Sequence, residues 1–497
     1  MKVNVNGDLN RYYVQMHCMI FFPGVKFSED GDDDGHEIDV TVIESENGVS
    51  ASVVLTVDGS SVSCEKYEDF KNEIPRERTA KIAVGAAVIA AGGELLGYRP
   101  SWGMLTGVRP AKVASELLNS GYSKTRVKKI LNTEYFVTPK KAALATEVAL
   151  NEAALIGVPS NKDCSVYISI PFCPSRCAYC SFVSYTSKQL LDKIPEYLDR
   201  IIDEMKKVFG TIKELGLNLK TVYIGGGTPT TLSADQLRRL LSEINEQTDV
   251  SSLEEFTLES GRPDTIDAEK FAVAAEYGVT RICVNPQTLC DEVLKGIGRN
   301  HTGDDFLKAY DFARNSGIKY INTDLIAGLP GDSFKTFSAT FDKILQLRPD
   351  NITVHTFCVK KSSDFLRRGS KVYSRRGGDT GKCVDYSQIK STQAGYKPYY
   401  MYRQKNTVGN YENVGFSLPG AEGLYNVYMM EEVHSIFAIG AGAVSKMVRL
   451  ADSPDEKPVI KRMFNLKYPY EYLREDRCTQ LCREYRDFYR DICDIDD

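Results

Sequence analysis

The sequence predicts an α/β fold: an open, partial (β/α)6 barrel with an N-terminal α+β domain before it and a C-terminal extension after it. From Ser165 onward, short β-rich runs alternate with amphipathic helical patterns, and repeated strand–helix units build a parallel sheet with right-handed crossovers. The six runs are SVYISI, TVYIG, EFTLES, RICVN, YINTDLI and NITVHTF. A closed barrel of this kind needs eight strands, so six runs predict an open one.

Residues 1–155 are expected to form a separate α+β domain of unknown role. The stretches RYYVQMHCMIFF, DVTVIES and VSASVVLTVDG alternate apolar and polar residues, which predicts two hairpins. The stretches RTAKIAVGAAVIAAG and KAALATEVALNEAALIG predict helices. We expect the barrel to occupy residues 160–385 and residues 386–497 to form a C-terminal extension that covers the substrate.

The composition is that of an ordinary soluble protein. The chain has 497 residues, of which 42% are hydrophobic and 26% are charged, and about 150 residues per domain gives roughly three domains. The net charge of -5 lacks the basic excess of a general nucleic-acid binder. The N-terminus has no apolar signal-like region, and the apolar stretch from Ile82 to Ala91 is too short to span a bilayer. We therefore expect a cytoplasmic protein without a membrane span.

Three of the thirteen cysteines lie close together directly after the first strand run. Cys173, Cys177 and Cys180 form a C-x3-C-x2-C array in PFCPSRCAYCSF. Soft thiolates select iron–sulfur clusters or zinc, and a structural zinc site normally has four protein ligands. Three cysteines favour a 4Fe-4S cluster whose remaining iron is open to a small molecule, and three unligated cysteines in a loop are the alternative.

This array resembles the signature of the radical S-adenosylmethionine (SAM) enzymes. The string VYISIPFCPSRCAYCSF, followed by GGGTPT, RICVNPQTL, IGRNH and DLIAGLP, resembles the oxygen-independent coproporphyrinogen III oxidase family. The runs TGVRP and KPYYMYRQKN are similar to its HemZ-type branch. The resemblance covers roughly Cys164 to the C-terminus, and it implies a radical SAM barrel that binds a 4Fe-4S cluster and S-adenosyl-L-methionine.

Polar residues interrupt the apolar strand runs and need partners. The resemblance implies that Glu259, Gln287 and Asp324 hydrogen-bond the ribose and methionine parts of SAM, and that the fork of Arg299 grips its carboxylate. The GGGTPT loop would receive the methionine amino group. His355 follows a strand and could face the barrel mouth. The cofactor-binding residues implied in this way are Tyr167, Tyr179, Gly226, Gly227, Thr228, Glu259, Gln287, Arg299, Asp324, Ile326, Cys358 and Val444.

The resemblance implies an oxidoreductase of haem biosynthesis that decarboxylates the propionates of coproporphyrinogen III to vinyl groups. Its partners would be a tetrapyrrole and an electron donor such as flavodoxin or ferredoxin. The family's decarboxylases carry a further cysteine two residues after the third ligand, where this chain has Ser181 and then Phe182. The alternatives are therefore a haem-binding chaperone and a haem-modifying radical SAM protein. A tRNA-modifying enzyme is disfavoured by the charge balance.

Three further groups of residues could have a function. The basic segment from Lys360 to Arg376 could bind substrate carboxylates or be a solvated loop. Arg403 and Lys405 lie among tyrosines and suit a flat aromatic carboxylate. Cys478 and Cys482 are four apart on a helical pattern, which suggests either a second metal site or thiols on the apolar face of a helix.

Overall fold

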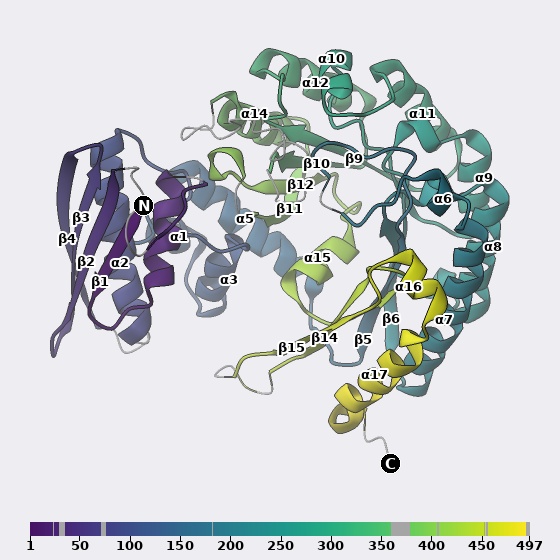
Figure 1. The fold of residues 1–497 in the computed structure, drawn as a ribbon, viewed down its shortest axis with the longest axis horizontal. Coiled ribbons are helices and arrows are strands. Elements are labelled where there is room, and N and C mark those ends of the chain that lie inside the picture. The colour runs from purple at the N-terminus through teal and green to yellow at the C-terminus, as the bar shows by residue number, and fades with distance from the viewer. Residues whose placement is uncertain are drawn as a thin grey trace.

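The computed structural model describes residues 1–22, 24–28, 35–70, 76–180, 182–358, 378–404, 407–451, 453 and 456–493. Figure 1 shows a small N-terminal sheet at one side of a much larger sheet whose helices form the opposite rim. The smaller sheet has four strands in the order β1-β2-β3-β4, and the larger has eleven. The α/β class and the open, partial barrel are confirmed.

The N-terminal domain packs one face of its sheet against helices. Its elements are β1 Lys2–Asn6, α1 Arg11–Phe21, β2 His36–Glu44, β3 Gly48–Val57, β4 Ser60–Asp69 and α2 Arg76–Leu96. β2, β3 and β4 form an antiparallel meander, and β1 pairs parallel to β2 because α1 crosses between them. The expectation that RYYVQMHCMIFF is part of a hairpin is wrong, since that stretch is helix α1. Its buried residues recur at the three-to-four spacing of a helix.

Helix α2 is longer than its apolar run suggests. Among the described residues it alone is long and apolar enough to cross a membrane by length and composition. It nevertheless packs against β3, β4 and α1, and 67% of its most apolar window is buried inside the protein. This burial is that of a core helix.

Three helices connect the N-terminal domain to the barrel. They are α3 Ala111–Asn119, α4 Lys124–Thr133 and α5 Pro139–Ile156. α5 packs against α3, α4 and β11, so it touches both parts of the protein (Figure 1).

All six strand runs of the predicted barrel are strands. They are β5 Asp163–Ile170, β6 Asn218–Gly226, β7 Glu255–Glu259, β8 Arg281–Cys283, β9 Tyr320–Ala327 and β10 Asn351–Thr356. Neighbouring strands pair in parallel in the order β5 to β10. Most of their residues are buried, as expected for parallel strands with both faces covered.

Most helices between these strands lie on the outer rim in Figure 1, and the short α6 lies inside it. They are α6 Lys188–Leu191, α7 Ile194–Glu214, α8 Ala234–Gln247, α9 Ala268–Glu276, α10 Asp291–Gly296, α11 Gly303–Asn315 and α12 Phe334–Leu347. α8, α11 and α12 begin with capping boxes at Ser233, Thr302 and Ser333, which satisfy the free backbone N–H groups of the first turn.

The C-terminal part of the chain extends the large sheet at both edges. Its elements are α14 Asp379–Gln393, β11 Lys397–Tyr402, β12 Asn413–Ser417, α15 Leu424–Glu431, β13 Ser435–Ile439, β14 Val444–Arg449, β15 Val459–Phe464, α16 Pro469–Arg474 and α17 Arg477–Cys493. β12 pairs antiparallel to β10 at one edge, and β13 pairs parallel to β5 at the other. The domain boundary expected after residue 385 falls inside α14.

A buried carboxylate joins the N-terminal domain to the barrel. Glu412 accepts hydrogen bonds from Trp102 Nε1 at 2.7 Å and from Lys141 Nζ at 2.6 Å. Arg403 is also buried, and its guanidinium donates to the carbonyl of Leu105. Arg403 therefore helps to hold the two parts together, and the expectation that it binds a ligand carboxylate gains no support.

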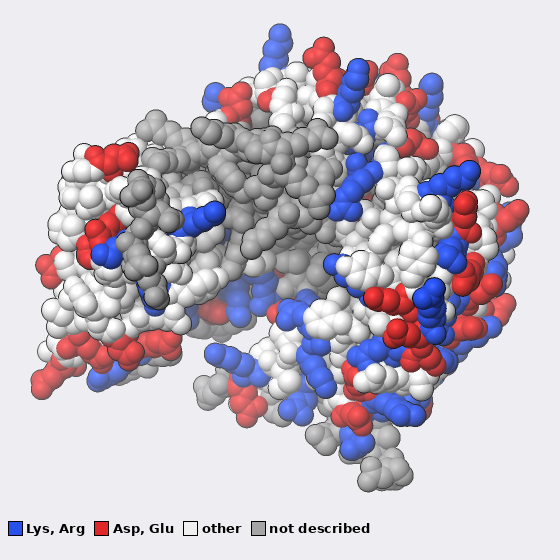
Figure 2. All heavy atoms as spheres, in the orientation of Figure 1, with Lys and Arg blue, Asp and Glu red and all other residues white. Residues whose placement is uncertain are grey.

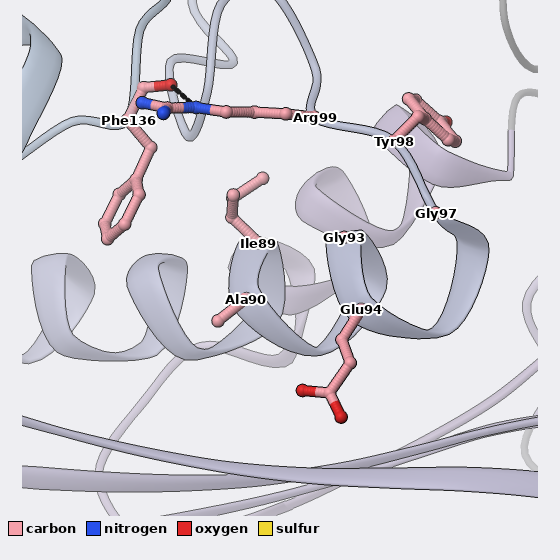
Figure 3. Close-up of a pocket in the computed structure, with 8 residues that line it drawn as sticks. All are labelled: Ile89, Ala90, Gly93, Glu94, Gly97, Tyr98, Arg99 and Phe136. Atoms are coloured by element: carbon pink, nitrogen blue, oxygen red, sulfur yellow. Dashed lines mark hydrogen bonds between the residues drawn. The ribbon is translucent and has the colours of Figure 1, made fainter.

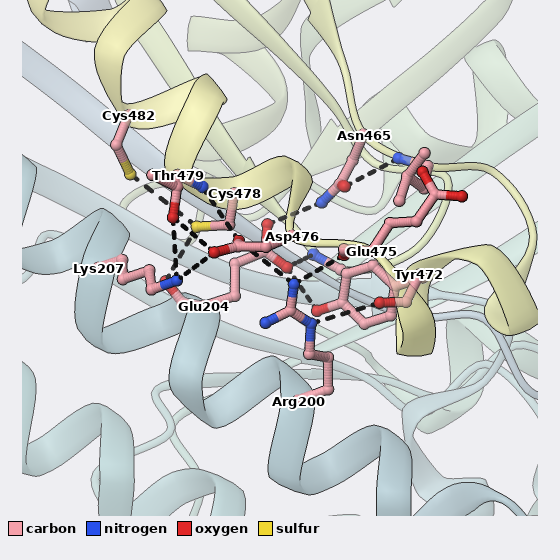
Figure 4. Close-up of polar contacts among 12 residues, drawn as sticks. Arg200, Glu204, Lys207, Asn465, Tyr472, Glu475, Asp476, Cys478, Thr479 and Cys482 are labelled. Atoms are coloured by element: carbon pink, nitrogen blue, oxygen red, sulfur yellow. Dashed lines mark hydrogen bonds and ion pairs between the residues drawn. The ribbon is translucent and has the colours of Figure 1, made fainter.

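A second buried carboxylate, Glu204 of α7, holds the last strands and helices in place (Figure 4). Its oxygens accept from the amide of Asn465 at 2.7 Å, from the backbone N–H of Gly440 at 3.1 Å and from the hydroxyl of Tyr472. Burial raises the pKa of Glu204 from 4.5 to about 7.

The raised pKa of Glu204 predicts a pH-dependent stability. Between about pH 4.5 and 7 the folded protein holds a proton on Glu204 that the unfolded chain releases, so the free energy of unfolding falls as pH rises through this window. A Glu204→Gln variant cannot titrate there and should show a smaller fall. Urea unfolding of both proteins across this pH range measures the difference. Glu214→Gln, near the exposed end of the same helix, is the control: pairing with Arg486 lowers the pKa of Glu214, so this variant should keep the wild-type slope above about pH 5.

Candidate cluster and ligand site at the barrel mouth

The three cysteines of the C-x3-C-x2-C array lie on the loop that follows β5, at the carboxyl edge of the parallel sheet. Cys173 and Cys177 are buried and Cys180 is partly buried. The N–H of Cys173 donates to the carbonyl of Tyr185 at 3.1 Å, and the N–H of Cys180 donates to that of Cys177 at 3.0 Å. These backbone hydrogen bonds therefore fix the conformation of the short loop that carries the three cysteines.

The glycine loop at the end of β6 packs directly on the cysteine loop. The N–H of Gly227 donates to the carbonyl of Ile170, and that of Thr228 donates to Phe172, both at 2.8 Å. The hydroxyl of Thr228 lies 3.2 Å from Cys173 Sγ. Gly226 has a φ of +113°, which a side chain would strain. The structure thus brings the predicted Gly226, Gly227 and Thr228 against the predicted cluster ligands.

An arginine that the sequence did not single out supports the same loop. Arg262 Nη1 lies 3.6 Å from Cys177 Sγ and donates to the carbonyl of Ser175 at 2.9 Å. Its Nη2 pairs with Asp264 at 2.9 Å. The only signal in the sequence was the position of Arg262 just after the third strand run.

The donor set fits an iron–sulfur cluster better than a single metal ion. Burial raises the pKa of Cys173 to about 11 and also raises the pKa of Cys180, so binding a cluster here would release protons. In the described parts of the chain, no three His, Cys, Asp or Glu side chains lie close enough to hold one ion. Three cysteines on one loop, without a carboxylate or imidazole among them, match the thiolate ligands of such clusters.

A partly buried carboxylate lies at the end of a neighbouring strand. Glu259, at the end of β7, accepts from the hydroxyl of Tyr223 at 2.5 Å and from Asn285 Nδ2 at 2.8 Å. Burial, together with the nearby Asp324, raises the pKa of Glu259 to about 7. Asn285 also accepts from the backbone N–H of Asp324 at 3.1 Å through its side-chain oxygen. Sequence reasoning did not find Asn285, because only the fold brings its amide between the carboxylate of Glu259 and the backbone of Asp324.

Gln287 has an unusual backbone and an unused acceptor. Its φ is +68°, which is rare for a residue other than glycine. Its backbone is fixed to β9, since its N–H donates to Asp324 and its carbonyl accepts from Ile326. The side chain is buried, yet Oε1 has no hydrogen-bond partner. Strain and an orphaned acceptor together make Gln287 a candidate contact for a ligand.

Arg299 is already occupied by protein groups. Its Nε lies 3.3 Å from the hydroxyl of Tyr179, and its Nη atoms donate to the carbonyls of Gly261 and Asn285. In this arrangement Arg299 braces the loops around the site. The predicted Tyr179 and Ile326 meet in one small apolar cluster beside it.

A chain of polar side chains crosses the barrel mouth. Asp324 Oδ2 lies 3.5 Å from His355 Nε2, and His355 Nδ1 lies 3.1 Å from the hydroxyl of Tyr402. Asp324 and His355 are each about one quarter exposed, so a ligand can reach them. His355 lies within β10, not after a strand as expected, and its side chain meets Asp324 and Tyr402.

The remaining predicted residues are spread around this centre. Tyr167 stacks with Tyr223 and with Tyr425 of α15 at ring distances of 6.2 and 6.3 Å. Cys358 is buried after β10, in a bridge to Thr407. Val444, at the start of β14, is 39% exposed. Among the described residues, no recorded contact joins it to the other predicted site residues. The basic segment from 360 to 376 and Lys405 lie outside the described residues.

Two other features are distinct from this site. A cavity of about 380 Å³ lies in the N-terminal domain between Ile89, Tyr98 and Phe136, and Figure 3 shows Glu94 pointing away from it toward the sheet. Arg99 at its rim donates to the carbonyl of Phe136. On the face drawn in Figure 2, Lys and Arg are interspersed with Asp and Glu over the barrel helices, so the described residues form no broad basic surface there.

The chain is similar to known radical SAM proteins over the part that carries this candidate site. The model of the Radical SAM superfamily matches residues 167–344, from β5 into α12. The oxygen-independent coproporphyrinogen-III oxidase-like protein HemZ of Bacillus subtilis is 39% identical over 357 residues, which cover 71% of each chain. The heme chaperone HemW of Lactococcus lactis is 34% identical over 57% of this chain and 69% of its own.

The chain is also similar in part to a solved structure. Coproporphyrinogen III oxidase (HemN) from Escherichia coli superposes with a TM-score of 0.46 at 22% sequence identity, over 60% of this chain and 67% of its own.

Proposed function

Because the chain belongs to the radical SAM family of HemZ- and HemN-like proteins, we propose that it is an oxidoreductase that decarboxylates coproporphyrinogen III without oxygen, in porphyrin and haem biosynthesis. Each of two propionates would lose a hydrogen atom, carbon dioxide and one electron to an acceptor, and become a vinyl group. The observation that carries this proposal is the cysteine loop closed against Gly227 and Thr228 at the barrel mouth.

The residues divide into a cofactor side and a substrate side. A bound 4Fe-4S cluster and SAM would supply the electron and the radical chemistry needed to remove hydrogen from an unactivated carbon. Cys173, Cys177 and Cys180 would hold the cluster. The free oxygen of Gln287 would accept a hydrogen bond from SAM, and the glycine loop would let the ligand approach its backbone closely.

The tetrapyrrole would lie over the partly exposed Asp324 and His355. Tyr402 fixes the imidazole of His355 through its hydroxyl, so the polar chain is held in one orientation for the substrate. Residues 386–497 would cover this side, since β11 carries Tyr402. An electron donor such as flavodoxin or ferredoxin would complete the system in the cytoplasm.

A heme chaperone is the second candidate. HemW of Lactococcus lactis carries that name, and this chain lacks the further cysteine after Cys180. Phe182, which occupies that position, is 69% exposed. An exposed phenylalanine beside the cluster loop would provide apolar surface for a porphyrin face.

An anaerobic product assay distinguishes the two functions. The reconstituted protein is incubated with SAM, dithionite and coproporphyrinogen III, and vinyl products and 5'-deoxyadenosine are measured. We expect vinyl product from the wild type and none from Cys177→Ala, because that variant lacks a cluster ligand. Cys164→Ala, which removes a buried cysteine from the start of β5, is the matched control and should remain active. Stoichiometric haem binding without any vinyl product would overturn the decarboxylase in favour of the chaperone.

A further inference from the structure

Two cysteine thiols touch each other at a place that the proposed function does not use. Cys478 and Cys482 lie one helical turn apart near the start of α17, and their Sγ atoms are 3.9 Å apart. Both are buried. In the described residues they belong to no cluster of three or more metal-ligating side chains, so the expectation of a second metal site gains no support.

The surroundings of the pair separate the two thiols chemically. Burial disfavours the thiolate at both cysteines, while the hydrogen bond between the two sulfurs lowers the pKa of Cys482 and raises the pKa of Cys478. Thr211 of α7 and the positive charges of Lys207 and Arg486 act in the same direction on the pKa of Cys482. The contact between the two sulfurs and the cationic side chains beside them therefore favour a thiolate on one member of the pair.

Negatively charged groups also face the pair. Glu204 of α7 lies next to Cys478: the Sγ of Cys478 is 4.0 Å from the backbone carbonyl oxygen of Glu204. Asp476 caps the start of α17 by accepting from Thr479, and it pairs with Lys207 at 2.9 Å (Figure 4). Lys207 therefore neutralises the negative charge of Asp476, and Lys207 also lies close to both sulfur atoms.

We propose that Cys478 and Cys482 are a redox-active dithiol that reacts with peroxide and closes to a disulfide. The thiolate of Cys482 attacks one peroxide oxygen, the O–O bond breaks, and the leaving hydroxide takes up a proton as water. The thiol of Cys478 then attacks the resulting sulfenic acid, the S–S bond forms, and a second water leaves. The two sulfurs lose two electrons in total, and the peroxide gains them.

The start of a helix can accept this bond. Side chains four apart on a helix have Cβ atoms about 5–6 Å apart, and a disulfide needs roughly 3.5–4.5 Å, so the turn must tighten. Cys478 is the second residue of α17, where backbone N–H groups have no partner within the helix. The N–H of Cys482 and the carbonyl of Cys478 are the hydrogen-bonded pair of this first turn, so tightening it strains that one helical bond. A thiol reductant would reverse the change.

Trypsin places both cysteines on one peptide, residues 478–483, because Arg477 and Arg483 flank them. The reconstituted full-length protein is treated with one equivalent of hydrogen peroxide, alkylated and digested. We expect this peptide to lose two hydrogens in mass and to escape alkylation, and dithiothreitol should restore both thiols. Cys383 is an internal control, since it is equally buried and burial raises its pKa to about 12.

Alkylation rates provide a second, independent measurement. Without peroxide, Cys482 should react with iodoacetamide about tenfold faster than Cys383 at neutral pH, because its thiolate is the more populated. In Cys478→Ser this advantage should shrink. A peptide 478–483 that stays reduced under peroxide, or that oxidises only to sulfinic acid, would overturn the proposal, as would equal rates at Cys482 and Cys383.

Discussion

A Gly227→Ala protein is expected to bind far less iron than the wild type. A Cβ at this position would lie 2.6 Å from the carbonyl oxygen of Phe172, 2.9 Å from its nitrogen and 3.0 Å from Cys173 Sγ. Two of these three atoms belong to the backbone, so the cysteine loop itself must move. Displacing the support of a metal ligand typically costs about 10-fold or more in metal affinity.

The measurement is iron and sulfide per chain after anaerobic reconstitution, together with the visible absorbance of the cluster. Gly210→Ala is the matched control, because a Cβ at Gly210 in α7 meets nothing within 4 Å. That change should leave the iron content unaltered and stabilise the helix by about 0.5–1 kcal/mol. Equal iron in both variants would show that the glycine loop does not support the cluster ligands as the structure indicates.

A Lys141→Met protein should be destabilised by about 3–5 kcal/mol. The side chains of Lys141 and Glu412 are only 2% and 0% exposed, and they pair at 2.6 Å. Removing the lysine leaves the carboxylate of Glu412 buried without its main cation. Trp102 still donates to that carboxylate, but a neutral donor compensates much less than a charge. Because this pair joins the N-terminal domain to the barrel, unfolding should begin there.

Lys140→Met is the control for this prediction. Lys140 precedes Lys141 and contacts the same Asp385, but its side chain is 68% exposed, so its loss should cost about 0–1 kcal/mol. Adding Glu412→Gln to Lys141→Met should recover part of the stability, since no buried charge then remains. Urea unfolding midpoints of the four proteins test both statements, and similar midpoints for the two lysine variants would contradict them.

The barrel was predictable because its signal is local. Each of the six strand runs is a short apolar segment between amphipathic helices, and the sequence shows this alternation directly. Helix α1 was missed since its stretch also fits an alternating pattern. Its buried Val14, His17, Cys18 and Phe21 nevertheless follow the helical spacing. The period of a short apolar stretch is ambiguous until its packing partners are known.

The site was predictable only in part, for a similar reason. The cysteine and glycine loops are contiguous motifs, so their residues could be named from the sequence. Asn285 and Arg262 act through contacts with residues distant along the chain, Glu259 and Cys177 respectively. No local pattern records such contacts. Arg299 and Arg403 are the opposite case. Their charge and their position in a motif suggested contacts with a ligand, but the sequence did not reveal the protein groups that already bind each guanidinium.

The pairing of β13 with β5 has a consequence for synthesis on the ribosome. All strands from β5 to β10 leave the ribosome before β13 does, so one edge of β5 has no neighbour in the nascent chain. An unpaired strand edge is a template for association with other chains. Chains released before Ser435 should therefore aggregate or recruit chaperones, even though they already contain every cysteine of the cluster loop.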